Sequence, residues 1–267
     1  MEILTTLSPA ETYLISEVSD AKLSEMLKLT FADLVRKKVL VIKEEEHQSH
    51  ENNPVRIISY VGIGENFEGY SMLLHEYPFL KPFEATTDIE YLFRNYVKMC
   101  YQNAGSLKSY IYGAFIDNGK LGENFRQNWF ARLIGGLYLS EKGLETNSNV
   151  MLTLQKLEKE LPVLIEQDRE QALEILKKLG GNIYLLKTID LQAIPQLAEE
   201  FADYRKHQHN GYDSGCSSCG GFVYFDDFST SFDNSCSSDT GGWSSGCGGD
   251  SGCSSGCSGC GGCGGCS

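Results

Sequence analysis

Basic residues are missing from the C-terminal part of this chain. Residues 209–267 contain no lysine and no arginine, although they carry six aspartates. The whole chain has a formal net charge of −13 at pH 7. Acidic surfaces repel the phosphate backbone of nucleic acids. The charge therefore argues against nucleic-acid binding, and it is compatible with the binding of cations.

Long apolar runs and a targeting signal are missing as well. No run of about 18 apolar residues occurs in the sequence, so we expect no membrane span. The opening Met1–Pro9 lacks the basic residues and the apolar stretch of a secretory signal peptide. We therefore expect a cytoplasmic protein. In that compartment thiols stay reduced, and clustered cysteines indicate metal or redox chemistry more often than disulfides.

Proline is also absent from residues 209–267, and glycine and serine make up more than half of them. Such a composition cannot bury enough apolar surface to offset the entropy lost when the backbone is ordered. We therefore expect residues 209–267 to form a disordered Gly/Ser/Cys-rich tail. The hydrophobic core must then come from residues 1–208, which is enough chain for one large or two small domains.

The N-terminal residues predict short helices followed by a β-hairpin. The segment Ser8-Pro9-Ala10-Glu11 has the residues of a capping box, with proline in the first turn. A second helix is expected after Asp20 and a third from Thr30, each with apolar residues at helical spacing. Two apolar runs at 39–42 and 55–61, separated by a polar loop, predict the two strands of the hairpin.

This order of elements resembles a winged-helix unit over residues 7–62, and we assign residues 1–65 to it. In DNA-binding winged helices the third helix is basic, which here corresponds to Arg36–Lys38. The wing, however, carries the acidic run Glu44–Glu46, where phosphates would have to approach. The charges favour a winged helix used for packing or protein contact over one that binds DNA.

Residues 66–208 are predicted to be mostly helical. They form either a second winged-helix-like unit or a plain helical bundle. We expect helices over 88–103, 107–115 and 125–139, one capped by Ser148, one over 168–179, a short strand at 183–186, and a last helix over 191–207. The predicted fold class is therefore mainly α with a small β-hairpin, followed by the disordered tail.

Nine of the ten cysteines lie in the tail, several of them at Cys-x2-Cys spacing. One such pair chelates a soft or borderline cation, and two pairs supply a tetrahedral zinc site. Thiolate clusters also suit Cu(I). Three states remain open: a defined zinc site, looser metal binding, or a flexible tail with unmodified thiols. The candidate metal ligands are His207, His209, Cys216, Cys219, Cys247, Cys253, Cys257, Cys260, Cys263 and Cys266.

A second interpretation treats these cysteines as substrates of another enzyme. The stretch Ser244–Ser267 resembles the core of the glycine-rich, gyrase-targeting microcin precursor and related azoline peptides, by its Gly-Ser-Cys composition and its Gly-Cys pairs. The resemblance implies conversion of cysteine and serine to thiazoles and oxazoles by a partner enzyme. A third interpretation is an assembly protein that is crosslinked through disulfides of the tail.

The layout of the whole chain also resembles a group of uncharacterised bacterial proteins, in which a helical domain precedes a Gly-, Ser- and Cys-rich end. The residues that carry this resemblance are the Leu7-Ser8-Pro9-Ala10-Glu11 start and the Leu34-Val35-x-x-Lys38-Val39-Leu40 run. The resemblance assigns no activity to this chain, because that group has none assigned. We expect a protein partner or a modifying enzyme to meet such a chain.

Enzyme signatures are sparse. The segment Gly62-Ile63-Gly64-Glu65-Asn66 is an incomplete glycine motif and is interpreted as a turn. His75, beside Glu76, is expected to be a structural histidine. Cys100 lies on an apolar helix face and is expected in the core. The sequence therefore predicts a non-enzymatic adaptor or carrier whose tail binds Zn²⁺ or Cu(I).

One segment of the tail differs from its surroundings. Aromatic residues gather at 222–228 and are followed by Phe232 and Trp243. Such a segment is either a strand that docks on the folded part or low-complexity sequence with spaced aromatics. The sequence does not decide between these two interpretations.

Overall fold

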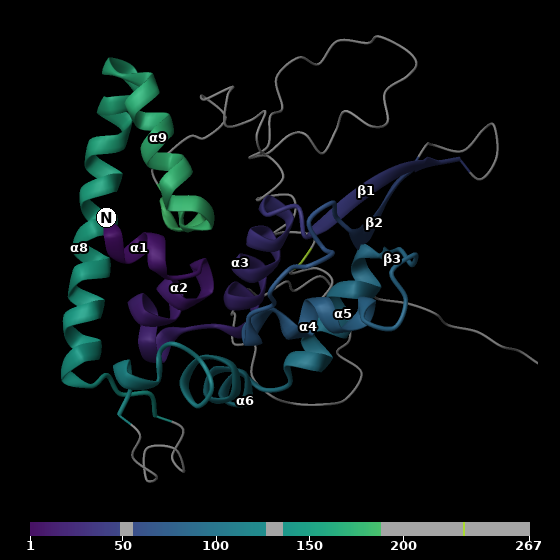
Figure 1. The fold of residues 1–267 in the computed structure, drawn as a ribbon, viewed down its shortest axis with the longest axis horizontal. Helices are drawn as coiled ribbons and strands as arrows, with labels where there is room; N and C mark the ends of the chain where they lie inside the picture. Colours follow the sequence, from purple (N-terminus) through teal and green to yellow (C-terminus); the bar gives the residue numbers. More distant parts are fainter. Residues whose placement is uncertain (49–55, 127–135, 188–231, 233–267) are drawn as a thin grey trace, which may run out of the picture.

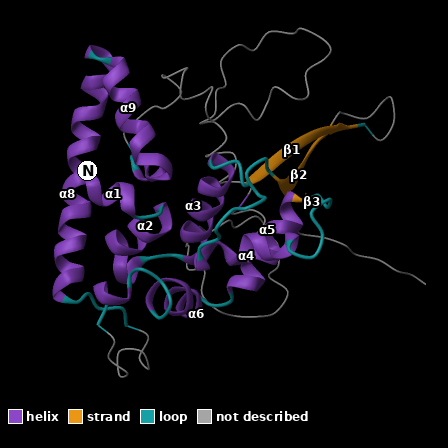
Figure 2. Ribbon diagram, viewed as in Figure 1, coloured by secondary structure: helices purple, strands orange, loops and turns teal. Residues whose placement is uncertain are grey.

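A computed structural model describes residues 1–48, 56–126 and 136–187, together with Phe232. The fold is mainly helical with one small antiparallel sheet, which confirms the predicted fold class (Figure 2). The predicted helix over 191–207 and the cysteines of the tail lie outside the described residues.

Three helices open the chain: α1 (Glu2–Thr6), α2 (Pro9–Glu17) and α3 (Leu23–Arg36). The predicted capping box is present at α2, where the Glu11 amide donates to Ser8 Oγ and the Ser8 amide donates to the Glu11 carboxylate. The prediction of two helices between Asp20 and Lys38 is wrong. Thr30 lies inside α3 and its hydroxyl donates to the Met26 carbonyl at 2.8 Å, so the residue that was expected to begin a helix belongs to a continuous one.

The predicted hairpin is formed by β1 (Leu40–His47) and β2 (Arg56–Ile63), with Leu40 paired to Ile63. A third strand, β3 (Tyr91–Leu92), pairs antiparallel with β2, which gives the order β1-β2-β3. Gly64 closes the base of the hairpin, because its amide donates to the Val39 carbonyl at 2.8 Å. A Cβ at this position would lie 2.1 Å from the Lys38 carbonyl oxygen, so the close approach requires glycine.

Short helices lie before and after β3 in the sequence, and the longest of them is α5. They are a 3-10 helix (Leu74–Glu76), α4 (Tyr77–Leu80), a 3-10 helix (Lys81–Phe83), α5 (Phe93–Ala104), α6 (Leu107–Ile111), a π-helical turn (Tyr112–Ile116) and a 3-10 helix (Gly122–Asn124).

The predicted helix over 88–103 is wrong in its first part, because residues 91 and 92 pair with β2 and α5 begins only at Phe93. The expected helix over 125–139 is also not seen at its two ends. Phe125 and Leu139 instead form an isolated antiparallel bridge, and residues 127–135 lie outside the described part.

A helical hairpin completes the described chain, with α8 (Glu141–Gln167) packed against α9 (Arg169–Leu179). The prediction that Ser148 caps this helix is wrong. Ser140 is the cap and accepts from the Gly143 amide at 3.1 Å, whereas Ser148 lies inside α8. Pro162 also lies inside α8, and the neighbouring Leu161 is buried in the core.

Residues 183–186 do not form the expected strand. A 3-10 helix (Gly180–Leu185) occupies this position. The Asn182 side chain fixes it by donating to the carbonyls of Leu4 at 2.6 Å and Leu7 at 2.8 Å. These hydrogen bonds attach the end of the helical hairpin to the N-terminal helices, which a local reading of the sequence does not show.

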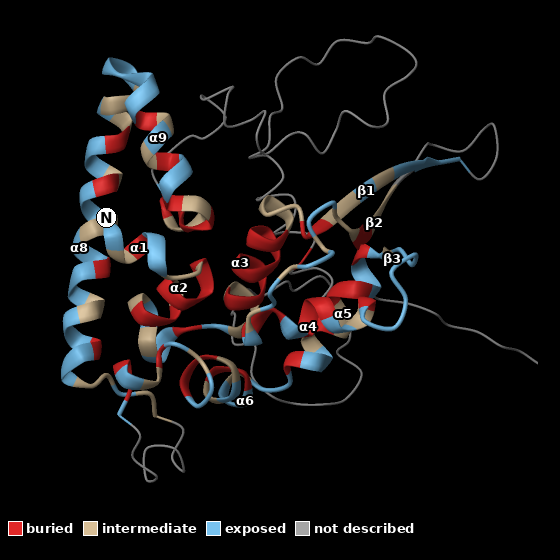
Figure 3. Cartoon of the chain, in the orientation of Figure 1, coloured by how far each residue is buried: buried red, intermediate tan, exposed pale blue. Residues whose placement is uncertain are grey.

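The core is one continuous cluster of buried apolar residues, with members on both sides of residue 65. Figure 1 shows α8 along one side of the molecule, beside α1 and α2, and the sheet on the opposite side. Buried residues concentrate in α2, α3, α4 and α5 between these two sides (Figure 3). Within the described ranges, no helix is long and apolar enough to cross a membrane.

Candidate functional site

The predicted metal ligands, from His207 to Cys266, all lie outside the described residues. The metal-binding prediction for them therefore stays a prediction. Over residues 1–48, 56–126 and 136–187, no group of three or more His, Cys, Asp or Glu side chains is arranged to hold a metal ion.

Cys100 is the one cysteine that precedes the tail, and the structure places it in the core, as predicted. Its side chain is fully buried on α5. Burial raises the pKa of the thiol well above its ordinary value, although a hydrogen bond with Tyr96 opposes this shift. Since the thiolate is the form that binds metals and attacks electrophiles, Cys100 is shielded from both kinds of chemistry.

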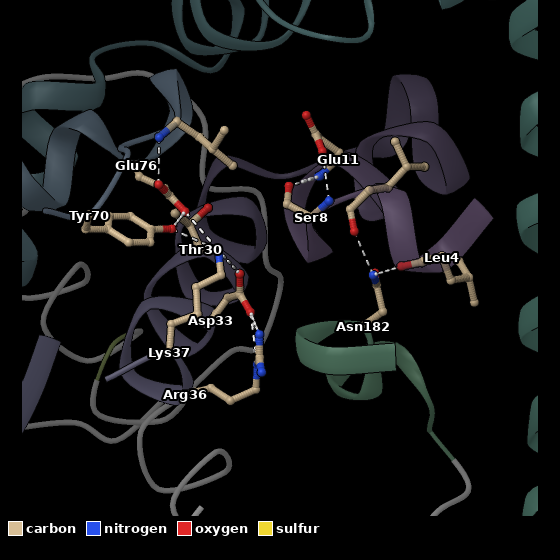
Figure 4. A network of polar contacts seen from close by, with 12 residues as sticks. Leu4, Ser8, Glu11, Thr30, Asp33, Arg36, Lys37, Tyr70, Glu76 and Asn182 are labelled. Carbon is tan, nitrogen blue, oxygen red and sulfur yellow. Dashed lines mark hydrogen bonds and ion pairs between the residues drawn. The ribbon is translucent and has the colours of Figure 1, made fainter. Parts of the chain in front are cut away.

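The main polar cluster joins the end of α3 to the segment 70–76. Lys37 Nζ lies 2.8 Å from Asp33 Oδ2, 3.2 Å from Glu76 Oε1 and 2.9 Å from the Tyr70 hydroxyl. Figure 4 shows this ammonium group between the two carboxylates, with Arg36 on the far side of Asp33. Both carboxylates are buried. The cluster therefore joins two buried carboxylates to two partly exposed cations in one network.

Each carboxylate in this network has further partners. Asp33 Oδ1 accepts from Arg36 Nε at 3.1 Å and from a terminal guanidinium nitrogen of Arg36 at 2.9 Å. Glu76 Oε2 accepts from the Leu73 amide at 2.7 Å, and the Tyr70 hydroxyl donates to Glu76 Oε1 at 2.8 Å. A buried charge is costly unless it is paired and hydrogen-bonded, and here both conditions are met.

The pKa shifts of Lys37 and Tyr70 agree with a structural role for this cluster. Burial alone lowers the pKa of the Lys37 ammonium, but the charges of Asp33 and Glu76 and the hydrogen bonds raise it by more, so the pKa lies above its ordinary value. Burial, aided by the Glu76 charge, raises the pKa of Tyr70 to about 12. Lys37 is thus a protonated ammonium with three acceptors, which does not act as a nucleophile or a base at neutral pH.

His75 lies next to this cluster and is buried, as the sequence suggested for a structural histidine. Its ring stacks on Phe115 with the centroids 4.9 Å apart, and its carbonyl accepts from the Tyr110 hydroxyl at 2.6 Å. Burial, followed by the nearby charge of Lys37, lowers the pKa of His75 to about 3. The imidazole is therefore neutral at physiological pH and stacked on Phe115.

One residue of the tail, Phe232, is described, and it contacts the body of the protein, by which we mean the described residues up to Lys187. The side chain of Phe232 is fully buried and belongs to the same core cluster as the helices. Its ring lies 5.6 Å from that of Tyr101, which is on α5. The sequence left open whether the aromatic segment docks on the folded part. Phe232 does so, whereas residues 222–228 and Trp243 lie outside the described chain.

Neither a protein-family model, nor a curated protein, nor a solved structure matches this chain. Its function is therefore inferred from its own residues.

Proposed function

We propose that this protein is a non-enzymatic carrier whose folded body presents a cysteine-rich segment that binds a soft metal ion, Zn²⁺ or Cu(I). The observation that carries the proposal is the spacing of the cysteines, with Cys-x2-Cys at Cys216 and Cys219 and again from Cys257 to Cys266. Two such pairs supply the four thiolates of a tetrahedral zinc site, and thiolates also select Cu(I).

The burial of Cys100 in the body supports this assignment. Cys100 is buried and its pKa is raised, so it does not compete with the other nine cysteines for metal ions. The net charge of −13 draws cations toward the chain. The proposal requires a reducing compartment such as the cytosol, because oxidised cysteines do not ligate metals.

The polar groups of the body support a carrier rather than an enzyme. Lys37 is surrounded by three acceptors, and His75 is buried and neutral. A catalytic acid or base needs a pKa near the working pH and access to a substrate proton. Neither residue has these properties.

The same contacts support a protein partner over a nucleic acid. The basic run Arg36–Lys38 is occupied by carboxylates, with Arg36 on Asp33, Lys37 on Asp33 and Glu76, and Lys38 on Glu65. Little uncompensated positive charge is left there for phosphates. We therefore propose that the carrier meets a protein, either a metal-receiving partner or a modifying enzyme.

A second candidate function rests on a different observation. A glycine directly precedes each of the last six cysteines, beginning at Cys247. Glycine has no Cβ and tolerates the backbone geometry of ring closure between neighbouring residues. This pattern favours a precursor whose cysteines and serines are cyclised by a partner enzyme with loss of water to azolines, and then oxidised to azoles where that enzyme supplies a two-electron oxidant.

Native mass spectrometry of the chain, purified from its own host under reducing conditions, separates these functions. Metal binding predicts adducts of zinc or copper mass that disappear in acid. Azole formation predicts a loss of one water per ring, with or without two further hydrogens, that persists in acid. Disulfide assembly predicts the unmodified mass under reduction and a ladder of multimers on a non-reducing gel.

A matched pair of variants shows which thiols matter. Replacing Cys257 and Cys260 with serine is expected to reduce the metal adducts, because serine does not replace a thiolate ligand. Cys100→Ala is the control and is expected to leave them unchanged, since Cys100 is buried in the core. An unmodified mass without adducts or multimers would contradict all three functions.

A further inference from the structure

Phe232 is far from the body in sequence but buried within it in space. The described chain before it ends at Lys187, and the next described residue is Phe232 itself. Its side chain has no solvent exposure and ranks among the largest fully buried side chains of the protein. A residue from the cysteine-rich part therefore completes the hydrophobic core of the body.

The contact is made on the flank of α5. The buried face of this helix is formed by Phe93, Tyr96, Val97, Cys100 and Ala104. Tyr101 is only partly buried and follows Val97 by four residues, so it borders that face on its solvent side. The Phe232 and Tyr101 rings are inclined at 49° with centroids 5.6 Å apart, a separation at which aromatic pairs attract.

We propose that Phe232 is an intramolecular anchor that fixes the cysteine-rich segment to α5 beside Tyr101. The position beside Tyr101 is thus occupied by a phenylalanine of the same chain. Anchoring divides the thiols into two groups. Cys216 and Cys219 lie in the sequence between Lys187 and Phe232, both of which contact the helices, whereas the cysteines from Cys236 onward follow the anchor in the sequence.

The covalent reach of the chain gives this division its consequence. Cys236 follows Phe232 by four residues, which span at most about 14 Å, so it stays close to α5. The last cysteine, Cys266, can reach up to about 110 Å from the same point. Under the proposed function, on which this consequence rests, Cys266 can present a metal ion to a partner farther from α5 than Cys236 can. The anchor itself does not depend on metal binding.

The segment offers its own control. Phe228 precedes Phe232 by four residues and is the same residue type, so the two phenylalanines share composition and position in the chain. An anchor predicts that Phe232 matters and Phe228 does not. A merely adhesive aromatic segment predicts that the two are equivalent.

Peptide-resolved hydrogen exchange tests the anchor on the full, reduced chain in the presence of a chelator. Phe232→Ala is expected to accelerate amide exchange in residues 98–104 and around position 232 roughly tenfold, since local opening becomes easier. Phe228→Ala is expected to match the wild type. Tyr101→Leu combined with Phe232→Ala is expected to give less than the product of the two single effects, because the rings are in contact.

Equal exchange in Phe232→Ala and wild type would overturn the proposal, as would equal effects of the two alanine variants. Protection that grows with protein concentration would also overturn it, because the phenylalanine would then come from a second copy. If Phe232→Ala raises exchange throughout the body, Phe232→Leu is measured in its place. The proposal then predicts that Phe232→Leu accelerates exchange only in residues 98–104 and around position 232. Exchange equal to that of the wild type contradicts it. If the exchange results support the anchor but the chain binds no metal, the anchor stands and the carrier function is contradicted.

Discussion

His75 makes the fold sensitive to acid, and the size of the effect follows from its surroundings. The imidazole is buried and stacked on Phe115, and its pKa is lowered from 6.5 to about 3, chiefly by burial and next by the charge of Lys37. In the unfolded chain the same group titrates near 6.5. Between these two values the unfolded state binds one more proton than the folded state.

The sign follows from this difference. The contribution of His75 to stability is present in full above about pH 6.5 and is lost as the pH falls toward 3. Each pH unit in this window lowers the free energy of unfolding by about 1.4 kcal/mol for one proton. At pH 5 the loss from His75 alone is about 2 kcal/mol. Phenylalanine keeps an aromatic ring beside Phe115 but binds no proton, so His75→Phe is expected to lack this loss.

Urea unfolding at pH 7, 6 and 5 in reducing buffer measures the effect. The quantity to compare is the change in the free energy of unfolding between pH 7 and pH 5 within each variant, so any offset of His75→Phe at pH 7 cancels. His47→Gln is the matched control, because His47 is exposed near the end of β1. An equal loss of stability between pH 7 and pH 5 in the wild type and in His75→Phe would refute the reasoning.

Three further predictions concern other parts of the body. Lys37→Met leaves the buried Glu76 without its cation and is expected to lower the free energy of unfolding by about 3 kcal/mol in urea titrations at pH 7; a loss below about 1 kcal/mol would show that the pair contributes little. Gly64→Ala places a Cβ 2.1 Å from the Lys38 carbonyl oxygen and is expected to lower the free energy of unfolding by about 2 kcal/mol in the same titrations. Gly113→Ala is the control and is expected to cause no such loss, because a Cβ there has open space around it. Cys100 is expected to react with a maleimide roughly 100-fold more slowly than the tail thiols in the native state, as followed by mass spectrometry, and comparable rates would mean that it is accessible.

Local signals in the sequence predicted the elements whose ends are chemically marked. The capping box at Ser8 begins α2, and Gly180, with a φ of 57°, ends α9. The hairpin was predicted because two β-branched runs flank a polar loop. In each case the residues that define the element lie within it, so no information from distant parts of the chain is needed.

The errors arose where tertiary contacts decide the structure. Tyr91 and Leu92 look helical by spacing, but they pair with β2. The segment after Gly181 looks like a strand, but the Asn182 side chain holds it against the N-terminal helices. Proline usually interrupts a helix, but α8 continues past Pro162, with Leu161 in the core and Leu164 packed against it.

The polar cluster was also beyond a sequence reading. Lys37 and Glu76 are 39 residues apart and meet only because α3 packs against the segment 70–76. The sequence predicted a structural histidine at His75, beside Glu76, but nothing local assigns Lys37 to these residues. The burial of Phe232 depends likewise on a contact with Tyr101, which precedes it by more than a hundred residues.

The central claim, that the thiols of residues 216–266 hold a metal ion, is tested most directly by metal content. The full chain, purified reduced from its own host and desalted, is analysed for zinc and copper per chain by inductively coupled plasma mass spectrometry. We predict at least one bound ion per chain, lost when the tail cysteines are replaced with serine and retained in Cys100→Ala. A chain without zinc or copper, or a serine variant that binds as much metal as the wild type, would contradict the account.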